Sequence, residues 1–168
     1  MSRATLMLVI SALSAVPSMT TSLAAQAGDR VAITKQMFTE GWMKHDGEAA
    51  SKAFGPTATS YTNGSPDSVR GPEDVKQTVK SLAVDWPDFT IHVLDVRQSG
   101  DHVYTHWRFE GTHKSTHKKV DIQGMNDDLW HGNQIVEERS YFDFVPVLKS
   151  QGYTITPPAD SGMKSMKK

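Results

Sequence analysis

The 168-residue chain contains no cysteine, which excludes a disulfide-stabilised scaffold, a cysteine-ligated metal, a thiol nucleophile and a lipoprotein anchor. It also lacks an excess of either charge: 18 Lys and Arg face 19 Asp and Glu, so we expect no nucleic-acid partner. We find no phosphate loop, no dinucleotide fingerprint and no convincing Ser–His–acid pattern. With 38% apolar residues, the chain has enough material for the core of one small domain.

The first 27 residues differ in composition from the rest of the chain. Arg3 is their one charged residue, an apolar run covers residues 6–16, and Ala25-Gln26-Ala27 matches an A-x-A cleavage site. The run has about half of the roughly 20 residues that a membrane-spanning helix needs. We therefore predict a secretory signal peptide over 1–27 and a periplasmic or secreted protein with no membrane association after cleavage. An uncleaved N-terminal anchor is the alternative.

Helical signals dominate the first part of the domain that follows, which we place at residues 28–153. The apolar spacing predicts helices over 29–45 and 47–54, and a third helix that starts at Gly71-Pro72 and closes at 86–88. Residues 57–62 are rich in Thr and Tyr and suggest a strand, followed by a turn at 63–66.

From Phe89 onward the apolar period changes to two, which is typical of strands. Turns at 99–101 and 131–133 and a polar loop at 112–119 separate four such segments, of which the last two cover 120–130 and 135–145. Residues 154–168 contain Pro, Gly and Lys and predict a flexible C-terminal tail. Helices followed by hairpin strands predict an α+β fold, with the helices packed on a curved antiparallel sheet.

Several segments resemble one known family. They are DHVYTHWRFEGTH (101–113), GPED (71–74) with WPDF (86–89), and IVEE (135–138) with Asp143 and QG (151–152). Together they resemble the SnoaL-like polyketide cyclases of the nuclear transport factor 2-like superfamily, over residues 30–153. The resemblance implies a cone-shaped fold with a deep, mostly apolar pocket and, in many members, a homodimer formed through the open face of the sheet.

The resemblance also implies roles for two acidic residues. Asp143 falls on the motif position of the aspartate that acts as general acid and base in the cyclases, and Glu138 stands where the motif has histidine. Since Asp143 lies between Phe142 and Phe144, apolar surroundings would raise its pKa towards neutrality. The alternative is a surface or helix-capping aspartate.

Asn126-Asp127-Asp128 is an unusual polar run inside a predicted strand. Side chains alternate along a strand, so Asp127 and Asp128 must point to opposite faces, and one of them faces the pocket. That residue is a candidate pocket acid or ligand contact. The alternative is one solvated aspartate and one structural ion pair.

The chain has seven histidines, and two pairs have i, i+4 spacing. Both pairs fall in predicted strand or loop, where the fourth residue along is about 13 Å away, so we expect no metal site. His106 is the best single candidate for a pocket or subunit-interface role, and an outward position on an exposed strand is its alternative.

Aromatic residues could line the expected cavity or simply fill the core. Trp42, Trp107 and Phe109 are candidate walls, and Tyr61 and Trp107 could donate hydrogen bonds to a ligand oxygen.

These observations lead to two hypotheses. In the first, an exported domain binds a small, mostly apolar molecule and acts on it as a cofactor-independent lyase or isomerase. Asp143 would then transfer protons with the help of His106 and Asp128, while Asp127, Glu138 and Tyr61 would orient the ligand. In the second, the domain is a non-catalytic ligand-binding or dimerisation module.

Overall fold

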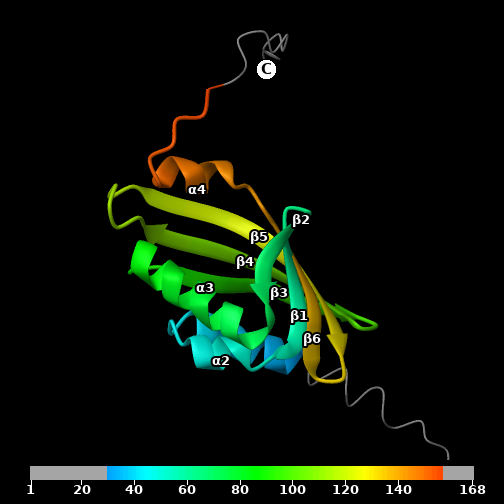
Figure 1. Cartoon of the computed structure of the whole chain (residues 1–168). Coiled ribbons are helices and arrows are strands. Elements are labelled where there is room, and N and C mark those ends of the chain that lie inside the picture. Colours follow the sequence, from blue (N-terminus) through cyan, green and yellow to red (C-terminus); the bar gives the residue numbers. More distant parts are fainter. Residues whose placement is uncertain (1–29, 157–168) are drawn as a thin grey trace, which may run out of the picture.

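The computed structural model describes residues 30–156 of the chain (Figure 1). A helix over residues 30–36 continues as the π-helix η1 (Met37–Trp42) and is followed by α2 (Gly47–Ser51), α3 (Gly71–Asp85) and α4 (Val145–Ser150). The strands are β1 (Phe54–Thr62), β2 (Ser65–Arg70), β3 (Thr90–Ser99), β4 (His102–Thr112), β5 (Lys119–His131) and β6 (Gln134–Phe142). The expected signal peptide and tail residues 157–168 lie outside the described residues. Within residues 30–156, no helix is long and apolar enough to cross a membrane.

The strands form one six-stranded sheet in the order β2-β1-β6-β5-β4-β3. Every neighbouring pair is antiparallel except β1 and β6, which run parallel. The expected antiparallel sheet is therefore corrected to a mixed one, because β1 and β6 lie far apart in the chain and no hairpin joins them. Strand β2 was not expected: Asn63 (φ 50°) and Gly64 (φ 81°) form a two-residue hairpin turn, so the chain returns at Ser65.

The alternation of side chains along the sheet determines what faces the interior. In β5, alternate residues from Val120 to Trp130 are buried, while those between them are exposed or half-buried. Gly124 belongs to the buried series, and a Cβ atom there would lie 2.3 Å from the Trp107 ring of the neighbouring β4. The missing side chain therefore lets the Trp107 indole lie over β5.

The first helix is tied to both ends of the sheet. Near its start, Arg30 donates from Nε to the carbonyl oxygen of Gly132 at 2.9 Å and contacts Asp101 at 2.8 Å. Just beyond its end, His45 Nε2 lies 2.9 Å from the carbonyl oxygen of Phe89. The helix thus spans the inner face from the hairpin end to the start of β3.

The second half of this helix is wider than the α-helix that the sequence predicted. The amide of Met43 donates to the carbonyl oxygen of Phe38 at 2.9 Å, which closes a five-residue turn. Such π-helical turns occur frequently at functional sites. In Figure 1, α2 and α3 lie on one side of the curved sheet, and α4 lies along β5. Helices α2 and α3 therefore cover one face of the sheet.

Candidate ligand-binding site

A cavity of about 380 Å³ opens between the curved sheet and the helices. Its walls are mostly apolar. They include side chains of η1, β4 and β6, and also Trp86, which directly follows α3. The aromatic members are Phe38, Trp42, Phe54, Trp86, Trp107, Phe109, Phe142 and Phe144. Binding sites for small molecules are typically apolar hollows of this size with few polar groups.

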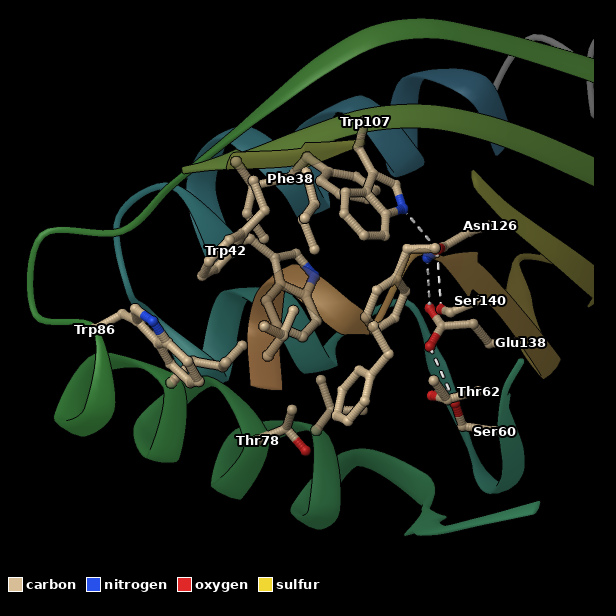
Figure 2. Close-up of a pocket in the computed structure, with 18 of the residues that line it drawn as sticks. Phe38, Trp42, Ser60, Thr62, Thr78, Trp86, Trp107, Asn126, Glu138 and Ser140 are labelled. Carbon is tan, nitrogen blue, oxygen red and sulfur yellow. Dashed lines mark hydrogen bonds between the residues drawn. The ribbon is translucent and has the colours of Figure 1, made fainter. Parts of the chain in front are cut away.

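Besides Thr78 and Gln151, the cavity wall contains five polar residues that gather at one end (Figure 2): Ser60, Thr62, Asn126, Glu138 and Ser140. We call this group the polar end. It is built by strand register: on β1 and β6, Ser60 pairs with Glu138 and Thr62 with Ser140, while Asn126 of β5 lies opposite Ser140. Three adjacent strands thus bring residues that are far apart in the sequence onto one patch of the inner face.

Hydrogen bonds connect the polar end to the aromatic wall. The Trp107 indole Nε1 donates to Asn126 Oδ1 at 2.7 Å, and Ser140 Oγ donates to the same oxygen at 2.9 Å. Asn126 Nδ2 in turn donates to Glu138 Oε2 at 3.1 Å, and Ser60 Oγ donates to Glu138 Oε1 at 3.2 Å. The Glu138 carboxylate, at the edge of an apolar cavity, therefore accepts hydrogen bonds from both Asn126 and Ser60.

A second carboxyl group lies beside Glu138, deeper in the protein. Asp128 is the cross-strand partner of Glu138, is fully buried, and has no hydrogen-bond partner on either side-chain oxygen among the described residues. Its burial raises the pKa well above the ordinary aspartate value, and the neighbouring Glu138 and Asp127 raise it further. This environment favours the protonated form of Asp128.

Four of the residues proposed from the sequence lie in the cavity wall: Trp42, Trp107, Phe109 and Glu138. Trp107, however, already donates its N–H group to Asn126, so this group is not available to a ligand. Asp128 faces the interior, on the same side of β5 as Asn126, as one of the two aspartates had to.

Asp143 does not lie in the cavity wall, and this corrects the expectation built on its motif position. Phe142 and Phe144 line the cavity, whereas Asp143 between them is exposed. Its Oδ1 accepts a hydrogen bond at 2.9 Å from the backbone N–H of Val145, the first residue of α4. Both sequence neighbours of Asp143 are apolar, but the surroundings of its side chain are not. The reason is that β6 ends at Phe142 and the chain turns there.

Three further candidates lie on the outer face of the sheet. His106 alternates with the inward Thr105 and Trp107 and contacts Gln123 at 3.0 Å. Asp127 lies 2.7 Å from His102, and the Arg139 guanidinium stacks 5.1 Å from the Tyr61 ring centroid. Successive side chains on a strand point to opposite faces, and each of these residues lies next to inward-facing ones. Their side chains are therefore directed away from the cavity.

Sequence reasoning missed Ser60, Ser140 and Phe38, and it named Asn126 only as part of an unusual run. The alternation of side chains along a strand could have placed Asn126 as it placed Asp128, because residues 126 and 128 lie on the same face of one strand. Ser60 and Ser140 carried no signal, since serines on strands are most often solvated. Among the described residues, no three His, Asp or Glu side chains are grouped so that they could hold a metal ion.

This chain matches nearly the whole length of several solved structures that have the same architecture. An NTF2-like protein from Burkholderia thailandensis E264 matches with a TM-score of 0.65 and 17% identity over 74% of this chain and 98% of its own. A SnoaL-like protein from Jannaschia sp. CCS1 has a TM-score of 0.67 and 19% identity, with 77% and 95% covered. IdmH from Streptomyces antibioticus has a TM-score of 0.61 and 22% identity, with 74% and 99% covered.

The fold is thus that of the NTF2-like α+β proteins, with a curved sheet around a cavity. The family model of the SnoaL-like polyketide cyclases matches residues 32–150, and the chain belongs to this family. No curated protein sequence matches the chain.

Proposed function

We propose that this protein is an exported domain that binds a small, mostly apolar molecule in the cavity between η1, α3 and the sheet. The observation that carries the proposal is a cavity of about 380 Å³ whose aromatic walls meet the polar end. Burial of an apolar ligand surface against such walls is favourable by about 25 cal/mol for each Å² removed from water.

A second candidate function is acid/base chemistry on the bound molecule, of the kind that a cofactor-independent lyase or isomerase performs. The observation in its favour is the pair of Glu138 and Asp128, which places an acceptor at the cavity edge and a buried carboxyl group beside it. Glu138 would take the proton, in place of Asp143, which is exposed. Carboxyl groups in apolar surroundings are well suited to proton transfer near neutral pH.

A thermal-shift screen of hydrophobic carbonyl and hydroxyl compounds tests the binding proposal. A compound that binds only the folded protein raises its melting temperature. The control is Thr78→Phe on α3, which fills part of the cavity and should abolish the shift. If no compound shifts the wild type, or if Thr78→Phe responds equally, binding in this cavity is excluded.

Export is tested by mass spectrometry of the full-length chain expressed in a bacterial host. We expect a secreted or periplasmic species that begins at Gly28, because Ala25-Gln26-Ala27 fits signal peptidase. An intact N-terminus in the membrane fraction would instead support an uncleaved anchor. As a matched control, Ala27→Arg should block processing.

A further inference from the structure

The polar end of the cavity is held together by hydrogen bonds within the protein. Ser60 Oγ donates to Glu138 Oε1 at 3.2 Å, and Ser140 Oγ donates to Asn126 Oδ1 at 2.9 Å. Asn126 also donates one N–H group to Glu138 at 3.1 Å, and both Glu138 and Thr62 have a further interaction within the protein. Much of the hydrogen-bonding capacity of this end is therefore already used.

Five wall residues outside the polar end carry a side-chain N–H or O–H group. Thr78 donates to a backbone carbonyl oxygen one turn earlier on α3 at 2.9 Å, and Trp107 donates into the polar end at 2.7 Å. The Trp86 nitrogen is itself buried, so a molecule in the cavity does not reach it. Trp42 and Gln151 are half-buried, and their side chains have no hydrogen-bond partner among the described residues.

These two residues differ in what they ask of a ligand. The Gln151 amide can both donate and accept, so it is compatible with either kind of polar group, whereas an indole N–H can only donate. Trp42 is the last residue of the π-helix η1, and Phe38 of the same helix also lines the cavity. Figure 2 shows the Trp42 indole extending into the cavity, away from the polar end.

The unpaired N–H group of Trp42 makes the binding of a pure hydrocarbon costly. A ligand that displaces water from a polar group without replacing its hydrogen bond loses affinity. Since no described residue accepts from Trp42, the replacement has to come from the ligand. Only an acceptor atom can supply it.

We infer that Trp42 orients the ligand by donating a hydrogen bond from Nε1 to an acceptor oxygen, such as a carbonyl, on an otherwise apolar molecule. The inference rests on the proposed function, since it concerns the same cavity. It adds the chemical class of the ligand and the residue that recognises it.

Two matched pairs of probes test the contact: 1-indanone against indane, and propiophenone against propylbenzene. Within each pair, the carbonyl oxygen is replaced by two hydrogens. Calorimetry gives the ratio of the hydrocarbon's Kd to the ketone's Kd for wild type and for Trp42→Phe, which keeps an aromatic ring but has no donor. We expect the ratio to fall about fivefold in Trp42→Phe. The comparison of ratios cancels the loss of apolar contact that both probes share.

Trp130→Phe is the matched control. Trp130 is a buried tryptophan outside the cavity wall, and its Nε1 has no hydrogen-bond partner among the described residues. The variant should keep the wild-type ratio. An unchanged ratio in Trp42→Phe, or an equal fall in Trp130→Phe, would overturn the inference.

NMR of the wild type gives a second measurement that does not depend on the folding of Trp42→Phe. The chain has four tryptophans and therefore four indole N–H signals. The Trp42 signal should move downfield with each ketone and not with its hydrocarbon. If none of the four compounds binds, the proposed function fails, whereas binding without a ketone-specific shift of Trp42 overturns this inference alone.

Discussion

At the residue scale, Asp128 has an unusual environment among the residues that the structure describes. A fully buried carboxyl group without a hydrogen-bond partner costs free energy when it is ionised, so its pKa lies well above the ordinary value. In the unfolded chain the same group titrates near pH 3.9. Between these two pKa values the folded state binds more protons than the unfolded state, and the free energy of unfolding therefore falls as the pH rises.

Asp128→Asn should remove this loss of stability. Since the amide does not titrate, the variant should gain stability relative to wild type as the pH rises from about 4 to 8, by about 1 kcal/mol or more. Urea denaturation across this pH range measures the difference. Asp143→Asn neutralises an exposed carboxylate and should show no comparable gain. Parallel curves for wild type and Asp128→Asn would mean that Asp128 is ionised in the fold.

The Trp107 indole can be tested in a similar way. Trp107→Phe removes the donor of the bond to Asn126, whereas the buried Trp86 Nε1 has no partner among the described residues. Both changes remove similar volume, so Trp107→Phe should cost about 1 kcal/mol more than Trp86→Phe in urea denaturation. Equal losses would show that the bond contributes nothing to stability.

At the scale of elements, the cavity depends on how closely strands and helices approach one another. Gly41 of η1 faces α2, and a Cβ atom there would lie 2.4 Å from the Ala50 Cα. On the sheet, Gly124 gives the Trp107 ring its place over β5. Neither contact is visible in the periodicity of the sequence, because periodicity reports which face is apolar and not how near the next element lies.

Gly124→Ala should displace the Trp107 ring into the cavity. We expect a loss of about 1–3 kcal/mol, which is typical of overpacking, and weaker binding of any ligand found in the thermal-shift screen. Gln123→Ala is the control, since its side chain lies on the outer face. If the Gly124→Ala variant keeps wild-type stability and affinity, the ring is free to move elsewhere.

At the scale of the whole molecule, the outer face of the sheet exposes several large apolar and aromatic side chains. Tyr104, Met125 and Tyr141 are exposed there, and Met125 is the cross-strand partner of both His106 and Tyr141. We propose that a second copy of the chain covers this face, which would give His106 the interface position offered as one of its alternatives.

Light scattering after size exclusion tests the dimer. The protein should have twice the mass of one chain, and Met125→Glu should convert it to the monomer, because the change replaces an exposed apolar side chain of this face with a charge. Thr57→Glu, at an exposed position near the start of β1, should leave the mass unchanged. A monomeric wild type at micromolar concentration would contradict the proposal.

The sequence by itself determined the α+β class, the family, the start of α3 and the opposite directions of Asp127 and Asp128. These conclusions depend on local rules, such as strand alternation and helix start signals, or on motifs that are contiguous in the chain. Only the tertiary structure decided that Asp143 is exposed and that Ser60, Asn126 and Glu138 meet at one end of a cavity. The physical reason is that strand order and register bring together residues far apart in the chain, and a side chain's environment depends on those neighbours rather than on the adjacent residues.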